Sequence, residues 1–248
     1  MSKVHVLHLY YDFFAMLDRR FKNPGADFSS GLERNTFWLL VMKINDCGGN
    51  MEKNMHLWEE YYQKILANPH RIQTEIAEAL NSSGNFKAID CGCGTGADIS
   101  FLVEKGYEVS GFDMHQESVK ICSDRFHGNP NVDISQSHFI DFNYFDCGLV
   151  LANLSLFFCE PKDFSEVWSK IDDAILPGGV FCGDFMGFRD SWVTDCDTTV
   201  CPLTEEQVNG LFSGYKVEQF KENDSQGVTA LGVTKHWHIY QVIAKKAQ

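Results

Sequence analysis

A run of closely spaced glycines joins a short apolar strand to a helix in the segment AIDCGCGTGADIS, Ala88 to Ser100. Glycines at alternate positions directly after a strand let the backbone turn sharply and let a ligand approach where a Cβ would collide. The N-terminus of the following helix offers free N–H groups to that ligand. Gly92, Gly94 and Gly96 therefore predict a nucleotide-type site in a strand–turn–helix unit.

The same turn carries two cysteines, Cys91 and Cys93, so a metal or redox site is the competing interpretation. No second pair of cysteines or histidines follows at the spacing of a zinc finger, and the sequence has no C-x-x-C motif. The sequence therefore favours small side chains that fill a tight turn, and it predicts no metal site. Nine scattered cysteines in 248 residues also favour reduced thiols and a cytoplasmic location.

Helical and strand patterns alternate along most of the chain, which predicts a doubly wound, Rossmann-like α/β sheet with helices on both faces. Strands are expected at 86–91, 107–113, 147–153, 180–185, 215–220 and 236–246. Helices are expected at 57–66, 71–80, 97–104, 117–126, 164–175 and 204–212. Two of the helices have apolar residues at helical spacing, namely Leu57, Tyr61 and Ile65, and Ile72, Ile76 and Leu80. The last two strands have no helix between them, so we expect an antiparallel pair at one edge.

Residues 1–50 differ from the rest of the chain and end in a loop signal, DCGGN, directly before Met51. Two explanations stay open: a genuine N-terminal extension, or upstream sequence translated before a natural start at Met51 or Met55. We expect the domain proper at 51–248, and we assign no chemistry to residues 1–50.

The formal net charge of −13 argues against binding to nucleic acid phosphates and to anionic membrane surfaces. The longest apolar block, TFWLLVMKI, is far shorter than the roughly 20 residues that span a bilayer. A small molecule is therefore the expected partner. The oligomeric state is not predicted.

An acidic residue ends each of the first two expected strands. Asp113 is positioned to accept hydrogen bonds from both hydroxyls of a ribose. The spacing Gly92-x-Gly94-x-x-Ala97 also satisfies a relaxed dinucleotide fingerprint, which keeps a nicotinamide cofactor open. Asp90 lies two residues before the first glycine, where a carboxylate would face a pyrophosphate badly. That position suits a ligand with an ammonium group and a cationic centre.

The run from Asp90 to Gly96 resembles the first motif of class I S-adenosylmethionine-dependent methyltransferases, and Asp113 resembles their ribose-binding acid. The family's seven-stranded sheet and its cofactor, S-adenosylmethionine, are then implied for residues 51–248. Cys91 and Cys93 depart from the motif, and nothing in the family's mechanism needs thiols there. The cofactor-binding residues that the resemblance implies are Asp90, Gly92, Gly94, Gly96, Asp113, Met114, Asp141, Phe142, Asn153 and Leu154.

Two of these pairs come from weaker motifs. The segment SHFIDFNY resembles the one that approaches the adenine, through Asp141 and Phe142, and LANLSLFF resembles the fourth-strand motif that lines the cofactor. The segments LWEEYY, GDFMGFRDSW and TALGVTKHWHIYQVIAKK look like a bacterial subfamily close to the tellurite-resistance and thiopurine-type methyltransferases.

The residues expected to meet the methyl acceptor lie in three segments: Trp58 and Tyr62 in the first helix, Arg189 and Asp190 after the fifth strand, and His236 in the last strand. Each has a purely structural alternative. Trp58 and Tyr62 can be core aromatics, Arg189 and Asp190 an ion pair, and His236 and His238 partly exposed residues of an edge strand.

The implied reaction is in-line displacement of a methyl group from a sulfonium, so the protein mainly aligns the reactants and excludes water. Soft acceptors need no general base, whereas an oxygen or nitrogen acceptor would use His236 or Asp190. No catalytic residue is assigned. The alternatives are an NAD(P)-dependent oxidoreductase, although no Tyr-x-x-x-Lys follows the fourth strand, and a non-catalytic cofactor-binding protein.

Overall fold

The computed structural model describes residues 51–194 and 199–248. These residues belong to one compact unit. The two explanations for residues 1–50 concern a segment outside the described residues, so they stay predictions. No helix among the described residues is long and apolar enough to cross a membrane.

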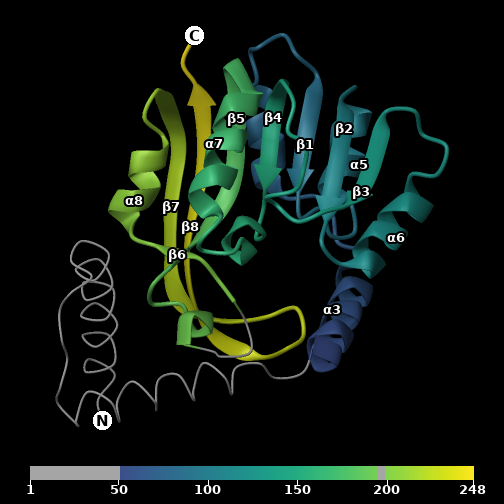
Figure 1. Cartoon of the computed structure of the whole chain (residues 1–248), viewed down its shortest axis with the longest axis vertical. Coiled ribbons are helices and arrows are strands. Elements are labelled where there is room, and N and C mark those ends of the chain that lie inside the picture. The colour runs from purple at the N-terminus through teal and green to yellow at the C-terminus, as the bar shows by residue number, and fades with distance from the viewer. Residues whose placement is uncertain (1–50, 195–198) are drawn as a thin grey trace, which may run out of the picture. The chain divides into compact units, whose positions relative to one another are not determined.

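A single twisted sheet forms the centre of this unit (Figure 1). Its strands lie in the order β3-β2-β1-β4-β5-β8-β7, with the short β6 paired to β5. Strands β1 to β5 pair in parallel, whereas β8 pairs antiparallel with both β5 and β7. The strand bounds are β1 Lys87–Cys91, β2 Glu108–Asp113, β3 Val132–Gln136, β4 Cys147–Ala152, β5 Ile175–Gly187, β6 Pro202–Leu203, β7 Tyr215–Val228 and β8 Thr234–Lys246.

Helices cover both faces of the sheet, which confirms the predicted fold class. Residues of α4 and α5 pack against one face, and residues of α7 and α8 pack against the other. Helix α8 opens with the capping box of Thr204 and Gln207. The helix bounds are α3 Met51–Ile65, α4 Ile72–Leu80, α5 Ala97–Glu104, α6 Gln116–Arg125, α7 Phe164–Ala174 and α8 Glu205–Leu211, with 3₁₀ turns η1 Leu156–Phe158 and η2 Ser191–Thr194.

The central strands are buried on both faces because helices lie above and below them. Every residue of β4 is buried, as its continuous apolar run predicts. The carboxyl ends of β1, β2 and β4 therefore meet at one edge of the sheet. In doubly wound sheets, ligands bind outside that edge.

Three sequence expectations are wrong in detail. Helix α4 buries Thr74 and Ala77, whereas Ile72 and Ile76 of the expected apolar stripe are exposed. The strand that carries the last histidines, β8, lies between β5 and β7 and is not at the edge. The hairpin β7–β8 is also much longer than expected, and it extends past the carboxyl ends of the central strands (Figure 1).

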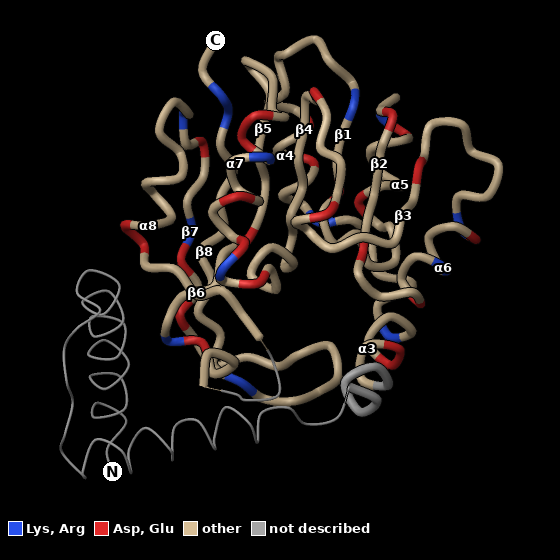
Figure 2. Tube along the Cα trace, in the orientation of Figure 1, with Lys and Arg blue, Asp and Glu red and all other residues tan. Residues whose placement is uncertain are grey.

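Lys and Arg residues are interspersed with more numerous Asp and Glu residues along the described chain (Figure 2). This distribution differs from the basic stripe that binding to a phosphate backbone requires.

Candidate functional site

The glycine turn lies directly after β1, and its tight packing explains why glycines occupy it. Gly92 has φ +74°, and a Cβ on it would lie 2.5 Å from the Cβ of Ser155, which follows β4. Gly96 also has φ +74°, and its added Cβ would lie 2.6 Å from the Phe126 ring. A Cβ on Gly94 would meet only Ile65 of α3, at 3.9 Å. The turn thus packs tightly against β4 and α6 but has more room below α3.

Hydrogen bonds from neighbouring elements hold this turn in place. The Gly92 amide donates to the Phe112 carbonyl at 2.8 Å. From α6, the Ser118 hydroxyl donates to the Gly94 carbonyl at 2.7 Å, and the Arg125 guanidinium donates to the Thr95 carbonyl at 2.9 Å. The turn is therefore organised before any ligand arrives, which lowers the entropic cost of binding.

Cys91 and Cys93 are both buried, but they face opposite sides of the sheet. Cys91 belongs to the core under α7, and Cys93 to the core under α5. Burial raises the pKa of the Cys91 thiol, and a hydrogen bond with Cys122 together with burial raises the pKa of Cys93. Two neutral thiols on opposite faces cannot ligate one ion, which supports their interpretation as packing residues.

Asp113 ends β2 and binds both the glycine turn and the next segment. Its carboxylate accepts from the Gly94 amide at 3.1 Å and from the His115 amide at 2.9 Å. The Tyr62 hydroxyl of α3 lies 3.4 Å away. Asp113 is only 6% exposed, whereas the neighbouring Met114 is 46% exposed. An acid, an exposed apolar side chain and the glycine turn thus line one corner.

Aromatic residues of α3 cover this corner. The Trp58 ring stacks on Tyr62, with centroids 6.0 Å apart, and lies 4.9 Å from the ring of His115. Burial lowers the pKa of His115, so its ring is neutral near pH 7. Trp58 and Tyr62, which were predicted to contact the acceptor, therefore lie beside the predicted ribose-binding acid.

Asp90 has an unusual environment. It is 3% exposed, and its carboxylate makes no hydrogen bond within the described residues. Burial, and then the nearby Asp98 and Asp113, raise its pKa well above the usual value. An ionised carboxylate here lacks a compensating cation, so the position suits a ligand that brings a positive charge.

Asn153 and Leu154 follow β4 and lie close to further acidic residues. The side-chain amide of Asn153 donates to Asp98 at 3.0 Å, and the backbone amide of Leu154 donates to Asp184 at 2.8 Å. Leu154 adopts φ 49°, which is uncommon for a residue with a side chain. Asp98 and Asp184 were not among the predicted residues, although both lie within quoted segments, AIDCGCGTGADIS and GDFMGFRDSW.

One cation lies near these acids. The Arg71 amide donates to Asp98 at 2.9 Å, and the Arg71 charge acts to lower the pKa of Asp184, which burial raises. The sequence provided no signal for Arg71, since it precedes α4, far from the glycine turn in the chain.

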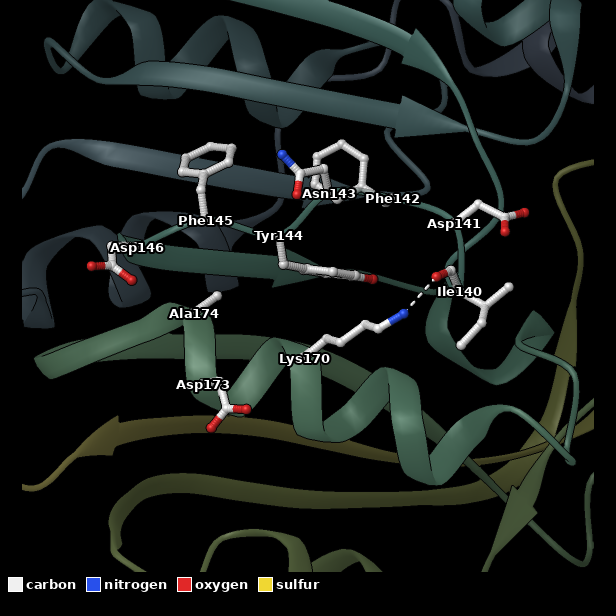
Figure 3. A pocket seen from close by; sticks show the side chains of 10 residues that line it. All are labelled: Ile140, Asp141, Phe142, Asn143, Tyr144, Phe145, Asp146, Lys170, Asp173 and Ala174. Carbon is white, nitrogen blue, oxygen red and sulfur yellow. Dashed lines mark hydrogen bonds between the residues drawn. The ribbon is translucent and has the colours of Figure 1, made fainter.

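Asp141 and Phe142 lie in the loop between β3 and β4. Phe142 stacks on Phe112 in the core under α7, with ring centroids 4.3 Å apart. Asp141 is exposed and lines, with Phe142, a cavity of about 410 Å³ between the loop 140–146 and α7 (Figure 3). Lys170 bridges this cavity to the Ile140 carbonyl at 2.8 Å. His138, three residues before Asp141, lies nearer the turn, since its charge acts on His115.

Arg189 and Asp190 do not pair with each other. The Arg189 guanidinium pairs with Glu222 and Asp224 of β7, both at 2.7 Å. Asp190 pairs with Lys235 of β8 at 2.5 Å and accepts from the Trp192 amide at 3.0 Å. Both residues thus tie the segment after β5 to the long hairpin. The buried Asp190 carboxylate is already satisfied, so it is poorly placed to act as a base.

The histidines of β8 belong to the same network. His236 lies 2.6 Å from Asp224, and His238 lies 2.9 Å from Glu222. Glu222, Asp224 and His238 are close enough to ligate an ion. However, the Arg189 amide donates to Nδ1 of His238 at 3.0 Å, so the ring proton lies on Nε2, which then has no lone pair for a metal.

Known proteins identify the domain. Residues 88–179 match a family model described as a methyltransferase domain. Residues 88–179 therefore belong to a methyltransferase domain. The enzyme class, the S-adenosylmethionine cofactor and the resemblance expected from Asp90 to Gly96 are thereby confirmed. No curated protein sequence matches the chain.

Solved structures share the fold of this methyltransferase domain. TehB from Haemophilus influenzae is 14% identical, with a TM-score of 0.57 over 73% of this chain and 63% of that one. The N-methyltransferase NodS from Bradyrhizobium japonicum, solved with S-adenosylhomocysteine, is 14% identical, with a TM-score of 0.54 over 76% and 98%. A Burkholderia thailandensis 1,6-didemethyltoxoflavin-N1-methyltransferase is 15% identical, with a TM-score of 0.54 over 90% and 93%.

A row of aromatic side chains leads from the glycine turn of the methyltransferase domain to the long hairpin. We call Trp58, Phe158, Trp192 and Trp237 the aromatic row. Successive ring centroids lie 5.4, 5.8 and 5.4 Å apart, and all four side chains are half-buried. The aromatic row joins α3, η1, η2 and β8, which no local motif could have brought together.

The residues around the turn fit S-adenosylmethionine. Gly92 offers a cradle that a Cβ would fill, and Asp90 offers a buried carboxylate without a partner among the described residues. The cofactor carries an ammonium group and a sulfonium, whereas a dinucleotide carries a pyrophosphate. The charge at Asp90 therefore favours the sulfonium cofactor.

Proposed function

We propose that the methyltransferase domain methylates a small molecule whose acceptor atom ionises without help from the protein. One observation carries this proposal: both candidate bases that the sequence indicated, Asp190 and His236, form ion pairs within the protein. Asp190 is bound to Lys235, and His236 to Asp224. In these two pairs the nitrogen left to accept a proton is Nδ1 of His236, which faces the Gln226 amide at 3.4 Å, so an oxygen or nitrogen acceptor would find a poor base there. A soft acceptor such as a thiolate needs none.

For the cofactor, we propose that Asp113 accepts from the ribose hydroxyls and Asp90 accepts from the ammonium group. Arg71 is the nearest candidate for the carboxylate of the same amino-acid moiety, because it is the cation beside Asp98 and Asp184. Gly92, Gly94, Gly96, Met114, Asn153 and Leu154 complete the proposed cofactor residues. Asp141 and Phe142 stay proposed residues for the adenine end, as the sequence resemblance implies.

For the acceptor, the aromatic row supports a flat, apolar molecule. Aromatic faces bind other rings by stacking and bind polarisable sulfur well. We therefore propose an aromatic thiol, or a closely related soft nucleophile, as the acceptor class.

Bound S-adenosylmethionine supplies an already activated methyl group. The residues of this chain then bind and orient the cofactor and the acceptor, and they exclude water from the site. Asp90 and Asp113 would hold the two ends of the cofactor, and Trp58 and Tyr62 of α3 would cover it. The aromatic row would offer the acceptor ring faces to stack on beside the cofactor. Proton transfer is left to the solvent.

The test uses 5-thio-2-nitrobenzoate, an aromatic thiolate at pH 7, and 3-hydroxybenzoate, a ring of similar size whose phenol stays protonated. We expect S-methylation of the thiolate, measured as loss of its visible absorbance with formation of S-adenosylhomocysteine. We expect no turnover of the phenol. Faster methylation of 3-hydroxybenzoate would contradict the soft-acceptor proposal.

The same assay separates the alternative functions. Cofactor binding without turnover of any thiol or phenol would favour a non-catalytic binding protein. Binding of NADH without binding of S-adenosylmethionine would favour an oxidoreductase and would refute the proposed cofactor residues.

A further inference from the structure

Lys235 occupies an unusual position in the molecule. It lies on β8, is 6% exposed, and places its ammonium group 3.6 Å from the Trp192 ring centroid and 3.8 Å from that of Trp237. The same ammonium group meets Asp190 at 2.5 Å. A single cation thus binds one buried carboxylate and the faces of two indole rings, which are favourable partners for a cation.

This arrangement connects three elements. Asp190 belongs to the segment after β5, and its other carboxylate oxygen accepts from the His238 amide of β8 at 3.0 Å. The Trp192 amide also donates to Asp190. The position of the Trp192 ring is therefore set from two sides, through its own amide and through Lys235.

Backbone packing shows how closely these elements fit. A Cβ on Gly187, at the end of β5, would lie 2.1 Å from the His238 ring. A Cβ on Gly227 of β7 would lie 2.7 Å from the Trp237 ring. Arg189 adds an outer connection to β7 through Glu222 and Asp224. Trp237 thus has little room on the side of Gly227.

We infer that Lys235 is a positioning residue that holds Trp192 in the aromatic row and thereby sets the acceptor-binding surface. The inference rests on the proposed function, because it requires that the acceptor contacts Trp192. If position 235 were needed only for core packing, an apolar residue would fill it without the cost of burying a charge. An apolar side chain could not hold Trp192 in this way. The Lys235 ammonium group contacts the Asp190 carboxylate, which orients the segment after β5, and it also contacts the rings of Trp192 and Trp237.

The experiment compares Lys235→Met, Lys235→Arg and the double variant Lys235→Met/Asp190→Asn. The double variant keeps the test valid if Lys235→Met fails to fold, because it removes both charges of the Asp190–Lys235 pair. Lys216→Met is the matched control, since Lys216 lies on β7 with a side chain 77% exposed. Trp192→Ala tests whether this ring contacts the acceptor.

We expect the double variant to raise the KM for 5-thio-2-nitrobenzoate about tenfold or more, with kcat changed less than about threefold. S-adenosylmethionine affinity should stay within about twofold, because the cofactor residues are untouched. Lys235→Arg should restore the KM in part, and Lys216→Met should not change it. An unchanged KM in the double variant, or in Trp192→Ala, would overturn the inference.

A second readout does not depend on the acceptor. In protein labelled with 5-fluorotryptophan, the ¹⁹F resonances of Trp192 and Trp237 are assigned from Trp192→Phe and Trp237→Phe. The double variant should shift or broaden both resonances, whereas Lys216→Met should leave them in place. Unchanged resonances would refute Lys235 as a positioning residue. If the wild type binds the cofactor but does not methylate the thiolate, only the proposed acceptor class fails.

Discussion

At the scale of single residues, Asp113 connects the glycine turn, the segment after β2 and α3 through one carboxylate. Ribose hydroxyls would bind the same oxygens. We expect Asp113→Asn to weaken S-adenosylmethionine binding by about 1.5–3 kcal/mol, the range for hydrogen bonds to a charged group. Calorimetry measures the affinity, and Asp133→Asn on the exposed side of β3 serves as the control. Equal affinity of Asp113→Asn and the wild type would refute the ribose assignment.

Gly92 permits a second test at this scale. It has a left-handed backbone and no room for a Cβ beside Ser155, whereas Gly106 has φ +87° and nothing within 4 Å of its added Cβ. Gly92→Ala should lower the free energy of unfolding by about 2–4 kcal/mol, from backbone strain plus collision. Gly106→Ala should lower it by about 1–2 kcal/mol, from strain alone. Urea denaturation measures both, and equal losses would contradict the tight packing at Gly92.

At the scale of elements, α3 covers the proposed cofactor site. It contributes Trp58 and Tyr62 next to His115 and Asp113, and Ile65 next to Gly94. Few other elements contact α3, so its stability in the free protein is expected to be low. A ligand below it would supply the missing contacts.

We therefore expect S-adenosylhomocysteine to slow amide hydrogen exchange in the part of α3 from Leu57 to Ile65 by about fivefold or more. Helix α8, on the other face of the sheet, should show no such change. Mass spectrometry of peptides from both helices measures the effect. Slowing in α8 but not in α3 would mean that the ligand binds elsewhere.

At the scale of the whole molecule, the net charge of −13 comes from an excess of acidic residues, and two of them, Asp90 and Asp184, are buried. Burial raises the pKa values of Asp90 and Asp184 in the folded state. Between the ordinary aspartate pKa of about 3.9 and the raised folded value, the native protein binds more protons than the unfolded chain. Stability of the free protein therefore falls as pH rises through that window, and the loss persists above it.

Asp90→Asn should remove most of this loss. We expect the variant to be more stable than the wild type by about 1–3 kcal/mol at pH 8 and equally stable near pH 4, while its cofactor affinity falls. Urea denaturation between pH 4 and pH 8 measures the difference. Asp224→Asn is the control of opposite sign, because the hydrogen bond from His236 lowers the pKa of Asp224. A constant difference for Asp90→Asn across this range would contradict the burial argument.

Local patterns predicted much of this molecule, and their success has a physical basis. The glycine turn, Asp90 and Asp113 follow one another within a short stretch, so strand ends and turn chemistry alone place them together. The capping box at Thr204 and the buried run of β4 are likewise set by neighbouring residues. The apolar pattern failed on α4, where Ile72 of the expected buried stripe is exposed.

By itself, the sequence determined the doubly wound sheet, the antiparallel last pair and the methyl-donor turn after β1, because each depends on residues close together in the chain. Only the tertiary structure decided which distant side chains meet. Arg189 pairs with β7 and Asp190 with Lys235, and the aromatic row gathers rings from α3 to β8. Such contacts depend on how far β7 and β8 extend and on the register between them, which no local pattern encodes.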